Sequence, residues 1–276
     1  MSYSAILVHV EVDPKAESRL HLAADIANQF GAALIGVGAE IFEPPTSAAA
    51  MGYVDGETLV AEAKAVEDDL ALAETRFTAA AEEVRGGAEW RVGVGLPSEL
   101  VACEARCADL IVCAPRHGEP LGFHTQADAG DVLMQSGRPV LVAPAGLARL
   151  DASSVVVAWK DTREARRATV DALPFLKRAR QVLVAEVCEE CDEVDAQARV
   201  ADVAAYLARH GIRASTAVRQ PVRGSVAEAL FEIAEMQDAG LIVAGGYGHA
   251  RLREWIFGGV TRELLARSKR AVLLGH

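Results

Sequence analysis

Residues 268–274 read SKRAVLL and repeat the pattern of residues 136–142, which read SGRPVLV. Further upstream in each copy, residues 240–243 read GLIV and residues 109–112 read DLIV. Short apolar runs of this kind, followed by helical patterns, are typical of buried strands in a parallel sheet. Two related runs in the same order therefore predict a chain of two halves with one plan.

On both sides of these runs, the sequence predicts strands that alternate with helices throughout both halves. In the first half we expect strands at 5–10, 33–38, 88–94, 109–114 and 139–143. In the second half we expect them at 154–159, 181–187, 212–218, 240–245 and 270–274. Such alternation predicts an α/β fold with two tandem five-stranded parallel sheets, each covered by helices on both faces. The expected domains are residues 1–146 and 151–276, and in each the ligand edge is the carboxyl end of the strands.

Composition narrows the class of function. The chain has 276 residues, 51% of them hydrophobic, and a formal net charge of −11. This charge argues against nucleic acids and anionic membranes as partners, because both need a basic surface. No apolar run approaches the roughly 20 residues of a membrane span, and the N-terminus does not read as a signal peptide. Five cysteines suggest reduced thiols, so we expect a cytoplasmic protein.

The loop after the fourth strand of the second half carries the chemistry. Residues 245–261 read GGYGHARLREWIFGGVT, with glycines at 245, 248 and 258. Glycine after a strand permits a sharp turn and close approach of a ligand. The second glycine pair opens a helix, whose N-terminus favours anions. The spacing therefore suits a ribose and a polyphosphate, although such glycines also serve plain turns.

Together, the loop and the repeat resemble the universal stress protein family. The signature of that family is a glycine, two residues, a glycine, nine residues, and a glycine followed by serine or threonine. Gly245, Gly248 and Gly258 match it. Together with the neighbouring residues His249, Gly259, Val260 and Thr261, and with Lys160 and Asp161 after the first strand of this half, they are the predicted nucleotide contacts. The sequences of residues 159–168 and 172–176 resemble the first strand and helix of the bacterial branch of the family, which has two such domains in one chain.

The resemblance implies a Rossmann-like fold of the adenine nucleotide alpha hydrolase type. It implies ATP, with or without Mg²⁺, or a related adenine nucleotide as ligand. It also implies two domains related by a pseudo-twofold axis and paired through their last strands, 139–143 against 270–274. The implied role is a stress-response sensor or switch, with a protein partner or a homodimer as its target.

Two positions depart from the family pattern. Gly259 stands where the family has serine or threonine, which leaves Thr261 as the nearest hydroxyl. Lys160 stands where an acidic residue usually follows the first strand, and Asp161 comes one place later. A lysine can meet a phosphate, but it cannot accept the hydrogen bonds that a carboxylate accepts. The equivalent loop of the first half, 114–118, lacks the later glycine pair, so we interpret that half as a degenerate, empty copy.

Other readings remain open. Cys188 and Cys191 form a CxxC, which suits a redox pair or half a metal site, or else a solvent-facing loop. We expect Cys103, Cys107 and Cys113 to be small core residues. The chain has no HExxH, GxSxG or Walker A pattern, so we nominate no catalytic or metal-binding residue and expect at most slow, incidental ATP hydrolysis. The alternative to a nucleotide sensor is a scaffold of the same fold that binds no nucleotide.

Overall fold

The computed structural model describes residues 2–13, 16–42, 56–115, 125–188, 193–221, 224–246 and 259–276. These residues divide into two compact units. The N-terminal unit comprises residues 4–136 and 145–148, and the C-terminal unit comprises 149–276 together with 137–144 and the first three residues. Strand β5 comes from the first half of the sequence but belongs to the C-terminal unit.

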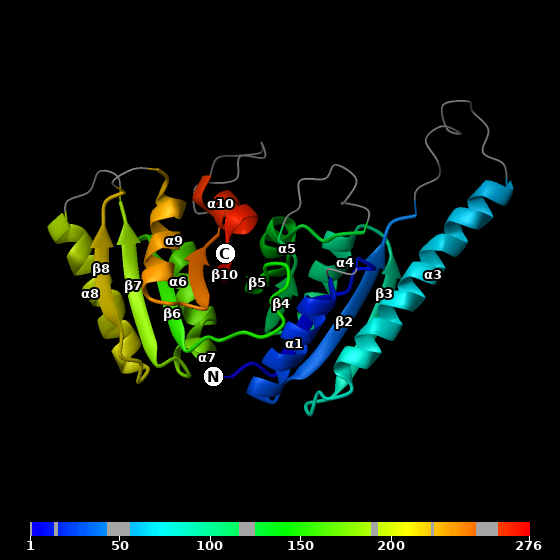
Figure 1. Ribbon diagram of the computed structural model, residues 1–276, viewed down its shortest axis with the longest axis horizontal. Helices are drawn as coiled ribbons and strands as arrows, with labels where there is room; N and C mark the ends of the chain where they lie inside the picture. Colours follow the sequence, from blue (N-terminus) through cyan, green and yellow to red (C-terminus); the bar gives the residue numbers. More distant parts are fainter. Residues whose placement is uncertain are drawn as a thin grey trace. The chain divides into compact units, whose positions relative to one another are not determined.

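In the N-terminal unit, four parallel strands run in the order β3-β2-β1-β4 (Figure 1). The strands are β1 (Ala5–His9), β2 (Ala33–Glu40), β3 (Ala88–Val94) and β4 (Leu110–Cys113). The helices are α1 (Glu17–Phe30), α3 (Gly56–Ala81), α4 (Pro97–Glu104), the 3-10 helix η2 (Ala105–Cys107) and α5 (Ala129–Ser136). The central strands β1 and β4 are almost wholly buried, as apolar strands covered on both faces should be.

In the C-terminal unit, six strands run in the order β5-β10-β9-β6-β7-β8. They are β5 (Val140–Val142), β6 (Ser154–Trp159), β7 (Gln181–Val187), β8 (Ser215–Arg219), β9 (Leu241–Gly245) and β10 (Ala271–Gly275). The helices are α6 (Arg163–Asp171), α7 (Leu173–Leu176), α8 (Glu193–Arg209), α9 (Val226–Met236) and α10 (Gly259–Arg267). All neighbours are parallel except β5 and β10.

The antiparallel contact between β5 and β10 confirms the predicted pairing of the two last strands. Val142 lies opposite Val272, and Val140 lies opposite Leu274. Both strands are buried along their whole length. The pairing gives the backbone groups on this side of β10 hydrogen-bond partners, which an open sheet edge would leave unpaired.

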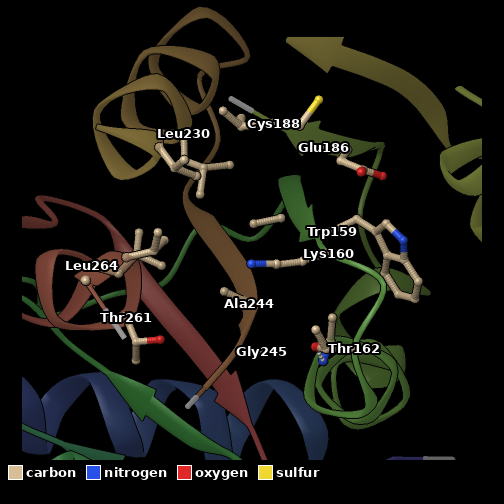
Figure 2. Close-up of a pocket in the computed structure, with 16 residues that line it drawn as sticks. Trp159, Lys160, Thr162, Glu186, Cys188, Leu230, Ala244, Gly245, Thr261 and Leu264 are labelled. Atoms are coloured by element: carbon tan, nitrogen blue, oxygen red, sulfur yellow. Dashed lines mark hydrogen bonds between the residues drawn. The ribbon is translucent and has the colours of Figure 1, made fainter. Parts of the chain in front are cut away.

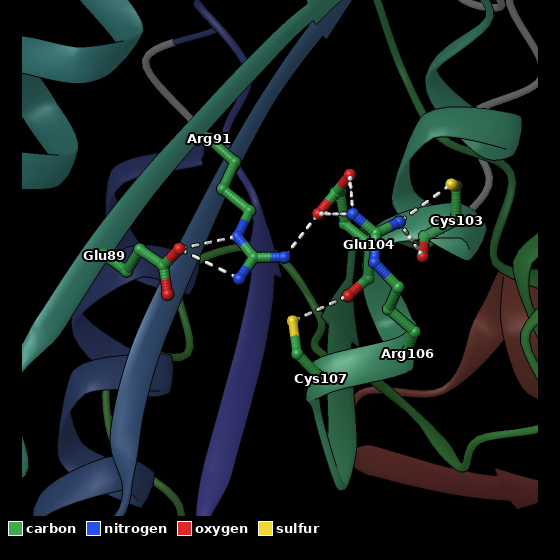
Figure 3. A network of polar contacts seen from close by, with 6 residues as sticks. All are labelled: Glu89, Arg91, Cys103, Glu104, Arg106 and Cys107. Atoms are coloured by element: carbon green, nitrogen blue, oxygen red, sulfur yellow. Dashed lines mark hydrogen bonds and ion pairs between the residues drawn. The ribbon is translucent and has the colours of Figure 1, made fainter.

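The cysteines correct one expectation from the sequence. Cys113 is buried as predicted, but Cys103 is exposed and Cys107 is only half-buried. Figure 3 shows the reason: this end of α4 carries a polar network in place of a packed face. Glu104 pairs with Arg91 at 2.5 Å and with Arg106 at 3.1 Å, and Arg106 Nη1 lies 3.0 Å from the Cys103 sulfur.

None of the helices in the described part of the chain combines the length and the apolarity that a membrane span requires.

Glu40 at the end of β2 makes the stability of the N-terminal unit depend on pH. Burial and the nearby carboxylate of Asp69 raise the pKa of Glu40 to about 7. Because the neutral acid is favoured in the folded state, the free energy of unfolding should fall as pH rises from about 4.5 to about 7. We expect Glu40→Gln to raise Tm at pH 8 by about 2–4 °C, after allowance for solvent screening, and to leave Tm unchanged at pH 4.

Thermal unfolding of both proteins across this pH range provides the measurement, and Asp69→Asn is the matched control. Neutralising Asp69 should shift the pH-dependent loss to lower pH without removing it. An equal Tm difference at pH 4 and pH 8 would show that the effect of Glu40→Gln is not ionic.

Candidate functional site

A cavity of about 610 Å³ opens at the carboxyl ends of the strands in the C-terminal unit. Along the sheet, β7 and then β8 follow β6 in one direction, whereas β9 and then β10 follow β6 in the opposite direction. Strand order therefore reverses between β6 and β9. In open α/β sheets this is where ligands bind, and the volume falls in the range of small-molecule sites.

The cavity has an apolar side and a polar side. Apolar walls come from the end of β7, from α9 and from α10, with side chains Val187, Val226, Leu230 and Leu264. The remaining lining residues are Ala158, Trp159, Lys160, Thr162, Ala165, Glu186, Cys188, Ala244, Gly245, Gly259, Val260 and Thr261. Mainly apolar walls with a few polar groups are the usual composition of a cofactor site.

The polar side combines a helix N-terminus with a lysine. Gly259, Val260 and Thr261 form the first turn of α10, whose unpaired N–H groups and positive dipole end favour an anion. Figure 2 shows Lys160 extending from the end of β6 into the cavity, with Thr261 on the opposite wall. A cation and a helix N-terminus thus line the same cavity.

Gly245 ends β9 where the first turn of α6 crosses the sheet. A Cβ at this position would lie 2.6 Å from the backbone nitrogen of Ala165, which no side chain can accommodate. The glycine therefore lets α6 pack directly on the strand end, and Thr162 caps α6 beside the cavity by accepting a hydrogen bond from the Ala165 N–H.

The helices on the apolar side are joined to each other. Ser225 caps α9 in a capping box with Glu228, and its hydroxyl lies 2.7 Å from a carboxylate oxygen of Glu263 on α10. The first turn of α9 and the middle of α10 are thereby held together on one side of the cavity.

Two lining residues present only part of their surface to the cavity. Trp159 and Glu186 are register neighbours on β6 and β7. In Figure 2 their side chains point away from Lys160. Glu186 is held by Arg199 of α8, with the shortest contact at 2.5 Å. Its carboxylate is therefore occupied by an ion pair.

Most of the predicted contacts that the structure describes come together here. Lys160, Gly245, Gly259, Val260 and Thr261 all line the cavity. Gly248, His249 and Gly258 lie outside the described residues, as does Cys191, while Cys188 lies at the cavity. Asp161 is not among the lining residues; it is exposed and pairs with Arg166.

Sequence reasoning missed the apolar wall. Val187, Val226, Leu230 and Leu264 come from three elements and carry no motif. Their apolar character is equally typical of core residues, so the sequence alone held no signal that assigned them to a cavity.

The corresponding place in the N-terminal unit is filled. By strand register His9 and Glu11 correspond to Ala158 and Lys160, and Arg19 lies three residues after the N-cap of α1, as Ala165 does in α6. His9, Glu11 and Arg19 are all at least 93% buried. One Glu11 oxygen lies 3.0 Å from Arg19 Nη2 and 3.2 Å from His9 Nδ1. His9 and Arg19 thus place large polar side chains where the other half has Ala158 and Ala165.

The charge of this cluster is internally balanced. Burial raises the pKa of the Glu11 carboxyl, but Arg19 and His9 outweigh burial and hold the pKa below its ordinary value. In the part of the chain that the structure describes, His9 Nε2 and two nitrogens of Arg19 meet no hydrogen-bond partner of acceptable geometry. We therefore describe the cluster as a buried ion pair with an additional histidine.

Two solved structures share the fold of this chain. A universal stress protein from Archaeoglobus fulgidus DSM 4304 matches over 98% of this chain and 94% of its own, at 18% identity and a TM-score of 0.71. A protein of unknown function from Pseudomonas aeruginosa PAO1 matches over 98% of this chain and 92% of its own, at 19% identity and a TM-score of 0.56. At these identities the likeness shows the fold alone.

A third solved structure is a universal stress protein in complex with cAMP. It matches over 51% of this chain and 97% of its own, at 21% identity and a TM-score of 0.34. That likeness is too weak to support an argument about the ligand of this chain. No curated protein matches the chain by sequence.

The universal stress protein family model matches residues 148–275, which contain the whole of the described cavity. The match agrees with the fold shared with the Archaeoglobus fulgidus protein. Residues 148–275 therefore form a domain of the universal stress protein family.

Proposed function

We propose that the second half of this chain binds an adenine nucleotide, ATP with Mg²⁺ being our first candidate, and acts as a stress-response sensor or switch in the cytoplasm. The observation that carries the proposal is the division of one cavity into an apolar side and an anion-attracting side. We assign the site to a domain at 151–276 and regard 1–146 as a second copy without a working site.

The apolar side suits a planar base. Val187 and the α9 residues Val226 and Leu230 lie on one side of the strand ends, where a purine would be shielded from water. Glu186, the carboxylate of the described lining, is engaged by Arg199. Recognition of the base would therefore rely on shape and on backbone groups.

The polar side suits phosphates. Phosphate oxygens are strong acceptors, and the first turn of α10 offers N–H groups together with the Thr261 hydroxyl. Lys160 adds a positive charge on the facing wall. The departure from the family pattern at 160 thus changes the role of this position from base or ribose acceptor to phosphate partner.

We propose a switch and not an enzyme because the cavity shows no residue poised to activate water. Within the described lining, Glu186 is the only carboxylate, and no histidine is present. The ion pair with Arg199 disfavours proton uptake by Glu186, so it is a poor general base. Ligand-dependent ordering around α10 would instead present an altered surface to a partner protein or a second chain.

The test is isothermal titration of Mg²⁺-ATP into nucleotide-stripped protein, beside the variant Leu230→Trp. Leu230 lines the apolar wall from α9 and is 4% exposed. An indole there should occupy the base position and weaken ATP binding by at least tenfold, whereas Leu230→Met conserves volume and should change affinity less than threefold.

One ATP per chain, with affinity lost in Leu230→Trp and kept in Leu230→Met, would support the proposal. If the well-folded wild-type protein produces no heat with millimolar ATP, the nucleotide hypothesis fails and the scaffold alternative takes its place.

A further inference from the structure

A second groove lies on the other face of the same strands, between α6 and α8. Its volume is about 390 Å³. Its lining comprises Trp159, Asp161, Arg166, Thr169, Val170, Arg199, Asp202, Val203 and Tyr206, all of them described residues. No part of the proposed nucleotide-binding function uses this groove.

The base of the groove contains an unsatisfied donor. Trp159 is 9% exposed, and its indole Nε1–H has no hydrogen-bond partner among the described residues. A buried donor without an acceptor is destabilising, and an acceptor atom supplied from outside would satisfy it. In Figure 2 the Trp159 ring points away from Lys160, and therefore away from the proposed nucleotide.

The charged residues at the groove largely neutralise one another. Arg166 pairs with Asp161, and Arg199 pairs with Glu186. Within the described part of the chain, Asp202 has no ion-pair partner, so its carboxylate is available to accept a hydrogen bond. With both guanidinium groups engaged, nothing here favours an anionic ligand.

The walls between these polar groups are apolar or aromatic. Val203 is buried on α8, whereas Val170 on α6 is 38% exposed. Tyr206 lies one turn along α8 from Asp202 and Val203, with its ring 4.7 Å from the ring of His210. A flat apolar body would cover Val170 and contact Tyr206 at the same time.

We propose that this groove binds a small, uncharged, planar molecule of the aromatic carboxamide class. Its carbonyl oxygen accepts the Trp159 indole N–H, and its amide N–H donates to Asp202. The aromatic ring lies against Val170, Val203 and Tyr206. Because the indole nitrogen is shielded from water, the ligand's carbonyl reaches it only after a neighbouring side chain moves. Arg166 and Arg199 line the groove, and their side chains are 57% and 32% exposed.

Benzamide is the probe, and the readout is the indole N–H signal of full-length protein labelled with ¹⁵N-tryptophan. The chain has three tryptophans, and Trp159→Phe identifies which signal belongs to Trp159. We expect a saturable downfield shift of that signal alone. Val170→Trp should fill the groove and weaken benzamide binding at least tenfold, whereas Val170→Ala should change it less than threefold.

Asp202→Asn provides a second check, because it removes charge but keeps an acceptor, and should weaken binding by no more than about fivefold. Saturating Mg²⁺-ATP should not displace benzamide, which separates this proposal from the proposed nucleotide site. The proposal is overturned by an unshifted Trp159 signal, by equal affinity in Val170→Trp, or by displacement with ATP.

Discussion

Replacing Arg19 by leucine is expected to lower the free energy of unfolding by about 3–5 kcal/mol, the largest effect of any single change considered for this protein. Arg19 and Glu11 are 6% and 7% exposed, and the Arg19 guanidinium lies 3.0 Å from the Glu11 carboxylate. Without Arg19, the carboxylate stays buried with His9 as its remaining partner. A buried charge that loses its main counter-charge is far more costly than an ion pair that is removed whole.

The matched control is the double variant Arg19→Leu, Glu11→Leu. It removes both charges and should recover much of the loss, so that it is more stable than Arg19→Leu alone. Urea unfolding, followed by circular dichroism, measures all three proteins. If the double variant is the less stable of the two, packing by the long arginine side chain matters more than charge.

The same pair predicts a dependence on pH. The pKa of Glu11 is held below its ordinary value in the folded protein. Stability from this group is therefore present above the unfolded pKa, and it is lost as pH falls through the folded pKa. In Arg19→Leu the Glu11 pKa should rise, so this variant should gain stability relative to wild type as the pH is lowered.

Reversing the charge at Lys160 should abolish measurable ATP binding. Lys160 faces the first turn of α10 across the cavity, and Lys160→Glu would place a carboxylate where phosphates are expected. The loss of an attraction and the gain of a repulsion should together weaken binding by more than about 100-fold, equivalent to about 2.7 kcal/mol or more. Titration calorimetry at two salt concentrations provides the measurement.

Lys160→Arg is the control, because it keeps the positive charge with a different shape. We expect it to bind ATP within about tenfold of wild type. Tighter binding by Lys160→Glu would mean that the side chain at this position contacts the base or the ribose of ATP, as the acidic residue of the family pattern does. Equal binding by all three proteins would place the ligand elsewhere.

Much of the architecture could be predicted from the spacing of apolar residues along the chain and from the residues that end helices and strands. The expected strand at 88–94 is β3, the one at 154–159 is β6, and the one at 181–187 is β7. Several other boundaries differ by one or two residues, and the largest difference is that the strand expected from 212 begins at Ser215. Ile212 follows the end of α8 and is buried; after the left-handed Gly211, its N–H donates to the carbonyl oxygen of Leu207 in the last turn of the helix. An apolar residue that closes a helix resembles one that opens a strand.

Local sequence was sufficient for the strands and for the glycine-marked end of β9, because these depend on residues close together in the chain. The pairing of the last strands joins segments far apart in the chain, and it was predicted from the family resemblance and not from local sequence. It was insufficient where side chains from separate elements meet. His9, Glu11 and Arg19 read as unrelated residues, yet they fill the N-terminal counterpart of the cavity. Whether a cavity is open depends on the summed volume of such side chains at one point in space, which neither spacing nor composition encodes.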